Sequence, residues 1–106
     1  MVDFADWIPP SQADSQPAEE YLVLDGTAQQ LNGGAGAAFT TLTIEAVSGN
    51  SDPVYLGGSA VGDANNPGLE LQPGQSWWTD KPGDVSDFYA LGTAGEHVRV
   101  LWQEVA

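Results

Sequence analysis

The stretch that decides the fold class is FTTLTIEAV, residues 39–47. Apolar and polar side chains alternate along it, and in an extended chain alternate residues point to opposite faces. This period of two predicts a strand with one face in the core and the other toward water. The residues expected to point inward are Leu42, Ile44 and Ala46, and those expected to point outward are Thr41, Thr43 and Glu45.

Short apolar runs separated by turns surround this strand. They predict about seven or eight antiparallel strands, and no segment keeps a capped helical period. We therefore expect an all-β fold, an antiparallel β-sandwich of the jelly-roll or immunoglobulin-like (Ig-like) kind with an extended N-terminal arm. The further strands are expected at residues 21–25, 27–31, 54–58, 69–71, 76–79, 88–91 and 97–105.

Two turns predict which strands pair. Asp25-Gly26 is a strong hairpin signal and is expected to join the strands on either side of it. The GTAG turn at residues 92–95 is likewise expected to join the last two strands as a terminal hairpin. The apolar side chains that share one face of the last strand are Val98, Val100 and Trp102.

Residues 1–20 are expected to form the arm, and residues 21–106 the folded domain. Prolines and acidic residues are interspersed in the first segment, which favours irregular or polyproline backbone over a packed element. Its one apolar cluster consists of Phe4, Trp7 and Ile8. This cluster either caps the core of its own domain or inserts into a neighbouring molecule, and the sequence leaves both alternatives open.

The charge balance of the chain is strongly acidic. Among its 106 residues 15 are Asp or Glu and only Lys81 and Arg99 are basic, so the formal net charge is −13. Nucleic acid and anionic membrane surfaces are excluded as direct partners, because binding to either needs clustered Lys and Arg. The excess of acid indicates either a protein that must stay soluble at high concentration or a high-salt habitat. No apolar run approaches the roughly 20 residues of a membrane span and no basic signal-peptide region begins the chain, so we expect a soluble product.

No group of residues in the sequence has the pattern of a catalytic or cofactor site. The chain has no Cys, its only His is His97, and Ser59 lacks the surrounding glycines of a nucleophile elbow. Asp80, Asp84 and Asp87 lie close together but do not match a calcium-binding loop, so a calcium site stays an open alternative. We therefore expect a protein that is not an enzyme, with no catalytic, cofactor-binding or metal-binding residues.

Aromatic side chains give the strongest indication of a binding surface. Trp77 and Trp78 are adjacent in a predicted strand, so one indole is expected in the core and the other outward. Tyr55 or Tyr89 is expected near the outward indole, where the group would form an apolar interface patch. An outward indole also fits stacking on a sugar, or coverage by the arm or a Gly-rich loop. The residues expected to bind a partner are Phe4, Trp7, Ile8, Tyr55, Trp77, Trp78 and Tyr89.

Four segments in the second half of the chain resemble, in sequence and in order, a pattern of small virion proteins of tailed bacteriophages. The segments are VYLGGSAV at residues 54–61, PGLELQPGQS at 67–76, DFYALG at 87–92 and VRVLW at 98–102. The resemblance spans about half of the chain and implies a capsid decoration, or cement, protein with a β-sandwich fold.

As the resemblance implies, the partner is the major capsid protein on the outer face of an assembled capsid, and the decoration protein is often a trimer. Such a viral structural protein is made in the host cytoplasm and ends on the capsid surface of the virion. Two other functions stay open, namely a phage tail or fibre component and a carbohydrate-binding β-sandwich module.

Overall fold

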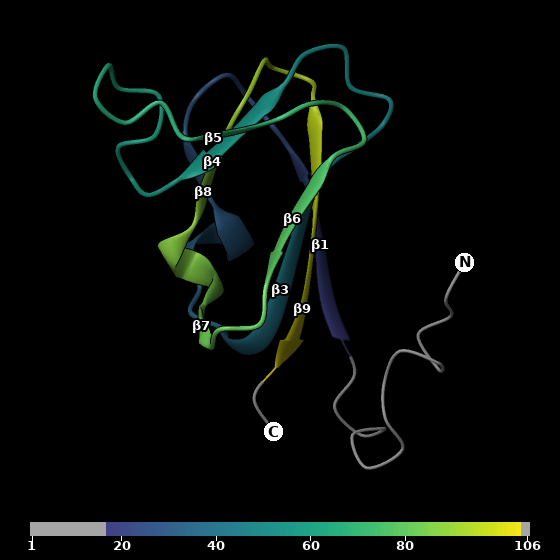
Figure 1. The fold of residues 1–106 in the computed structure, drawn as a ribbon, viewed down its shortest axis with the longest axis vertical. Helices are drawn as coiled ribbons and strands as arrows, with labels where there is room; N and C mark the ends of the chain where they lie inside the picture. Colours follow the sequence, from purple (N-terminus) through teal and green to yellow (C-terminus); the bar gives the residue numbers. More distant parts are fainter. Residues whose placement is uncertain (1–16, 105–106) are drawn as a thin grey trace.

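Two antiparallel sheets pack face to face in the computed structural model of the protein, which describes residues 17–104 (Figure 1). This arrangement confirms the predicted all-β fold and the antiparallel β-sandwich. Sheet A consists, in spatial order, of β1 (Pro17–Val23), β9 (His97–Glu104), β3 (Ala38–Ala46) and β6 (Ser76–Thr79), and β7 (Gly83–Asp84) also pairs with β3. Sheet B consists of β2 (Gln29–Gln30), β8 (Tyr89–Leu91), β4 (Val54–Gly57) and β5 (Leu69–Leu71). Two 3₁₀ turns, η2 (Leu31–Gly34) and η3 (Val85–Asp87), lie between strands.

The inner face of sheet A follows the predicted alternation. On β3, Leu42, Ile44 and Ala46 are all fully buried. The register places each of these residues opposite an inward residue of β9, so the two central strands present one continuous apolar surface. The pairs are Leu42↔Trp102, Ile44↔Val100 and Ala46↔Val98.

A break in the register lets β3 bury one more side chain than strict alternation permits. Phe39 lies three positions before Leu42, so in a regular strand the two would point to opposite faces. The register between β3 and β9 shifts between Phe39 and Thr41, as in a β-bulge. Such a shift adds a residue to one strand, and here both Phe39 and Leu42 are buried.

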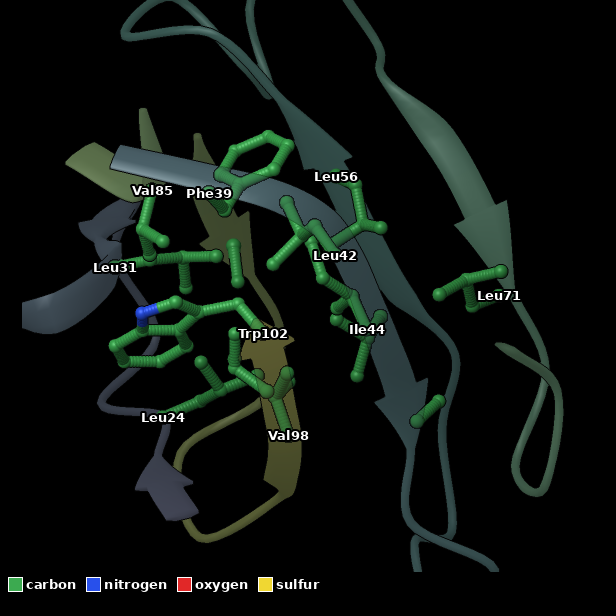
Figure 2. Packing of buried hydrophobic residues seen from close by; sticks show 14 residues of the cluster. Leu24, Leu31, Phe39, Leu42, Ile44, Leu56, Leu71, Val85, Val98 and Trp102 are labelled. Atoms are coloured by element: carbon green, nitrogen blue, oxygen red, sulfur yellow. The ribbon is translucent and has the colours of Figure 1, made fainter. Parts of the chain in front are cut away.

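Sheet B and the connecting segments close the core from the other side. The buried side chains of β4, β5 and β8 face those of sheet A, and Leu24, Leu31 and Val85 come from segments that link strands. Figure 2 shows these groups meeting between the sheets. The buried residues that sheet B contributes are Val54, Leu56, Leu71 and Ala90.

The predicted hairpin around Asp25-Gly26 is wrong. β1 pairs with β9 in sheet A whereas β2 pairs with β8 in sheet B, so the chain crosses between the sheets here. The turn itself does form. Gly26 has φ of 90°, and the Asp25 carboxylate accepts hydrogen bonds from the N–H and the hydroxyl of Thr27. Leu24, directly before the turn, is buried in the core, and its burial favours crossing the sandwich over turning back along β1.

The predicted terminal hairpin is wrong for a related reason. β8 belongs to sheet B and β9 to sheet A, so residues 92–95 also connect the two sheets. A Cβ atom on Gly92 would lie 2.5 Å from Leu24 Cδ1, so a side chain at this position would require the buried leucine to shift. The Leu24 N–H donates to the Glu96 carbonyl over 2.8 Å, which ties the two crossings together.

Strand β1 begins inside the segment predicted as the arm. Residues 17–20 pair with β9 in a register that starts at Pro17↔Gln103. Proline occupies the first position of a strand at the sheet edge, where its missing N–H removes no necessary ladder hydrogen bond. Residues 17–20, which the sequence assigns to the arm, therefore belong to sheet A. The apolar cluster of Phe4, Trp7 and Ile8 lies outside the described residues.

Candidate functional site

The two adjacent tryptophans of β6 point to opposite faces of sheet A, as the sequence predicts. Trp77 pairs with the inward Ile44 and packs against the core, where its ring centroid lies 5.6 Å from that of Phe88. Trp78 pairs with Thr43 and is 64% exposed. The outward indole is therefore Trp78.

Trp78 ends a row of outward side chains that crosses sheet A. The register aligns Glu19 with Leu101, Leu101 with Thr43, and Thr43 with Trp78. The neighbouring row aligns Tyr21 with Arg99 and Glu45, and Val23 stands one row further along β1. Tyr21, Val23 and Trp78 are large apolar side chains that are more than half exposed. We call this surface the Trp78 face, and it consists of Glu19, Tyr21, Val23, Thr43, Glu45, Trp78, Arg99 and Leu101.

Arg99 holds the middle of the Trp78 face in place. Its Nη1 lies 3.2 Å from Glu45 Oε1 and its Nε lies 3.9 Å from Glu19 Oε1. The guanidinium carbon is 6.0 Å from the centre of the Tyr21 ring, and His97 stacks on the same ring at 5.0 Å. Exposed ion pairs of this kind contribute about 0–1 kcal/mol to stability, so this group of contacts matters more for the make-up of the surface than for the stability of the fold.

Tyr55 and Tyr89 do not lie near Trp78, which corrects the predicted patch. Both belong to sheet B, where Tyr55 alternates with the buried Val54 and Leu56 and therefore faces outward. The Tyr55 hydroxyl donates to Glu70 Oε2 over 3.4 Å, and the adjacent carboxylate raises the pKa of Tyr55. The two tyrosines lie on one outer face of the sandwich and Trp78 on the other, so the aromatic residues form two separate surfaces.

An apolar hollow opens between the sheets where β5 and β6 form their edges. It has a volume of about 320 Å³, and its walls include Leu56, Leu69, Trp77 and Phe88. Gly57 and Gly58 form a further part of the lining, and Asp87 is the one ionisable residue among those that line it. We call this cavity the edge hollow. The sequence analysis missed it, because it depends on which two strand edges meet, although the Gly-Gly step after a strand signals a place without side chains.

With these surfaces described, the chain can be compared with known proteins. No family model, curated protein or solved structure matches it. The resemblance to phage virion proteins therefore stays a prediction from sequence. The Trp78 face and the edge hollow are accordingly interpreted from their own geometry.

One member of the predicted acidic group makes structural hydrogen bonds. Asp84 Oδ1 accepts from the Ser86 hydroxyl at 2.7 Å, from the Ser86 N–H at 2.9 Å and from the Ala37 N–H at 3.1 Å. These bonds, the one from the Ser86 side chain first, lower the pKa of Asp84, and the carboxylate caps the start of η3. Among residues 17–104 no three His, Asp or Glu side chains are grouped so that they could hold a metal ion. The same part of the chain contains no helix that could span a membrane.

Proposed function

We propose that this protein is a structural virion protein that decorates and stabilises the outer surface of a bacteriophage capsid. The observation that carries the proposal is the exposed indole of Trp78 on the outer face of sheet A, beside Thr43 and in the same row as Leu101. Tryptophan is the residue type most enriched among those that dominate protein interfaces, and large exposed apolar groups mark interaction sites. The Trp78 face is therefore the contact with the major capsid protein.

The make-up of the Trp78 face suits attachment to another protein. Trp78 and Leu101 supply apolar contact in one row, while Arg99 and Glu45 supply an ion pair in the neighbouring row. Interfaces commonly combine apolar contact with polar and charged groups. The central strands β3 and β9 are each paired on both sides, so the backbone that carries Thr43 and Leu101 needs little ordering on binding.

The same proposal includes a trimer on the particle, with Phe4, Trp7 and Ile8 of the arm as further contacts. A net charge of −13 on each copy opposes self-association. Salt shortens the screening length from about 10 Å at 0.1 M to about 3 Å at 1 M, so trimers are expected to become more stable as salt rises. Sedimentation velocity at both salt concentrations tests this, and a monomer at 1 M salt and on the particle would contradict it.

The experiment that tests capsid attachment compares Trp78→Ala with Tyr55→Ala. The two variants each remove an outward aromatic ring, but from opposite faces of the sandwich. Capsids that lack the protein are mixed with each purified variant and sedimented. Trp78→Ala is expected to lose about 2 kcal/mol of binding, or about 30-fold in affinity, and Tyr55→Ala to bind like the wild type. Wild-type binding by Trp78→Ala would refute the role of this face, and absence of the protein from purified particles would refute the function.

A carbohydrate-binding module is the second candidate function, and the exposure of Trp78 favours it as well. A flat indole can stack on a sugar ring, and the Thr43 hydroxyl and Glu19 carboxylate lie in the same row of side chains. Titration with glycans while Trp fluorescence is recorded separates the two candidates, because a capsid protein is indifferent to sugars. Mass spectrometry of separated heads and tails distinguishes a capsid protein from a tail or fibre component.

A further inference from the structure

The edge hollow has the size and the lining of a site for an apolar side chain. Its volume of about 320 Å³ exceeds the roughly 150 Å³ of an apolar cavity that binds benzene. Leu69 contributes to the wall and is 47% exposed, and Trp77 contributes although it is only partly buried. A bound aromatic or branched aliphatic side chain would remove both groups from water, which is favourable.

Two consecutive glycines, Gly57 and Gly58, form part of the lining of the hollow. An ideal Cβ on Gly58 would meet no other atom within 4 Å, so a side chain fits there but the sequence does not supply one. At Gly57 a Cβ would come within 3.0 Å of Val61, so this position is already tight against its neighbour. At Gly58, a residue that lines the hollow, the described part of the chain therefore leaves space that no side chain occupies.

The charge of Asp87 distinguishes between the chain's own acidic arm and a basic segment of another protein as the occupant of the hollow. Asp87 is the one ionisable side chain that lines the hollow, and it is exposed at the protein surface. Residues 1–16 contain Asp3, Asp6 and Asp14 but no Lys or Arg, and Asp6 directly precedes Trp7. The chain's own arm, or that of a second copy, would therefore bring carboxylates toward a carboxylate, which is unfavourable.

We infer that the edge hollow binds an aromatic or branched aliphatic side chain that is flanked by Lys or Arg and belongs to a different protein. The flanking cation pairs with Asp87, and the negative field of a chain with net charge −13 attracts basic segments. The inference rests on the proposed function in one respect, since the segment is taken to belong to the capsid protein to which this chain attaches. The hollow would be a second contact, at the open edge of the sandwich beside the Trp78 face.

The test uses the full chain and short blocked peptides, so it does not require capsids. The probe is acetyl-Lys-Trp-Leu-Lys-amide, and the comparison peptides are acetyl-Glu-Trp-Leu-Glu-amide and acetyl-Lys-Ser-Ser-Lys-amide. Amide and indole signals of the protein are followed by NMR during titration. The first peptide is expected to shift the signals of Gly58, Leu69, Asp87 and Trp77. Each comparison peptide is expected to bind at least about tenfold more weakly, because it lacks either the cations or the apolar side chains.

Substitutions at two glycines provide a matched pair. Gly58→Leu adds a large side chain at a residue that lines the hollow and is expected to weaken binding of the probe at least about tenfold. Gly49→Leu is the control, because a Cβ there also meets nothing within 4 Å and Gly49 lies away from the hollow. Should Gly58→Leu fail to fold, Leu69→Ala removes a wall of the hollow at a half-exposed site and is expected to weaken binding similarly.

Asp87→Asn tests the contribution of charge to binding. This variant is expected to weaken binding of the probe about threefold at low salt and to have no effect at 1 M salt.

Three results would overturn the inference. Equal affinity for the Lys-flanked and Glu-flanked peptides would show that charge does not select the occupant. Wild-type binding by folded Gly58→Leu or Leu69→Ala would place the peptide elsewhere. Shifts at Gly58 and Leu69 caused by Trp7→Ala without any peptide would show that the arm occupies the hollow. Loss of capsid binding in Trp78→Ala is measured separately, so failure of this inference and failure of the proposed function are distinguishable.

Discussion

Sheets A and B share one core but differ in how their strands are built. β1, β3 and β9 of sheet A have 7, 9 and 8 residues, whereas the strands of sheet B have 2 to 4 residues. The long strands of sheet A pair over most of their length, so their inward side chains form a continuous wall. The short strands of sheet B are interrupted by loops, and their burial depends on sheet A. We therefore expect side chains in the core of sheet A to contribute more to the free energy of unfolding than those of sheet B.

The outer faces of the two sheets also differ, in how much of an aromatic ring each one exposes. On sheet A the indole of Trp78 projects from the edge strand β6 and stays mostly exposed. On sheet B the outward Tyr55 is partly covered and hydrogen-bonded to Glu70. A surface with a mostly exposed aromatic ring is a better site for a partner than one whose ring already has a polar neighbour.

The largest expected effect tests where the stability resides. Leu42 is fully buried in the middle of sheet A, and Leu71 is 5% exposed on the edge strand β5. We expect Leu42→Ala to lower the free energy of unfolding by about 4 kcal/mol and Leu71→Ala by about 2 kcal/mol, because an edge site can relax around the lost volume. Denaturant unfolding of both variants measures the difference. A larger loss for Leu71→Ala would contradict the unequal roles of the sheets.

The second prediction separates the two faces of β6. Trp77→Ala is expected to lower the free energy of unfolding by about 2 kcal/mol, since it removes a partly buried ring packed on Phe88. Trp78→Ala removes a ring that is 64% exposed and is expected to cost less than about 1 kcal/mol. Urea unfolding of the two variants, which have the same composition, makes the comparison. Equal losses would mean that the outward indole also supports the fold.

Strands β3 and β9 of sheet A could be predicted from sequence, whereas the start of β1 and the two predicted hairpin pairings could not. The alternation around Leu42 and Ile44 is a local signal and specifies a strand and its buried face without further information. Pairing depends on where the chain goes after a turn, and the Asp25-Gly26 turn leads into the other sheet. A turn signal specifies local backbone, but the burial of Leu24 decides the direction of the chain.

The sequence likewise predicted the local geometry of the candidate site but not which residues meet there. That Trp77 and Trp78 face opposite ways follows from the geometry of any strand, and the structure shows which one faces out. The separation of Trp78 from Tyr55 and the existence of the edge hollow follow from the assignment of strands to sheets. Neither could be deduced from spacing along the chain.

The third prediction concerns the junctions between the sheets and their dependence on pH. Hydrogen bonds, the one from the Ser86 side chain first, lower the pKa of Asp84 below 3.8 in the folded protein. The unfolded chain then binds a proton more readily, so this carboxylate stabilises the fold above pH 3.8 and the contribution is lost as the pH falls through the lowered pKa. Asp84→Asn is expected to melt at a lower temperature than the wild type at pH 7, and the gap is expected to narrow below pH 3.8.

Asp25→Asn is the matched control for this pH dependence. Hydrogen bonds from Thr27 also lower the pKa of Asp25, but they lie within one exposed loop, whereas Asp84 joins β7 and η3 to the chain before β3. The effect of Asp25→Asn on the melting temperature is therefore expected to be smaller. Thermal unfolding between pH 2.5 and 7 compares the variants, and an equal gap at all pH values would contradict the role given to Asp84.

The smallest effect is expected at a large side chain of the inner face of sheet A. Trp102 is 4% exposed, yet its indole Nε1 finds no hydrogen-bond acceptor within residues 17–104, and Figure 2 shows it in the cluster with Leu24 and Leu31. A buried donor without a partner costs about 1–3 kcal/mol, while replacing indole by phenyl leaves a small cavity that costs a similar amount. The two changes oppose each other, so Trp102→Phe is expected to alter the free energy of unfolding by less than about 1 kcal/mol.

Trp102→Ala is the control for this prediction. It creates a large cavity and is expected to lower the free energy of unfolding by about 3–5 kcal/mol. Denaturant unfolding of both variants decides the matter: a loss of more than about 2 kcal/mol in Trp102→Phe would mean that the N–H group has a partner or that the indole packing outweighs its unmet hydrogen bond.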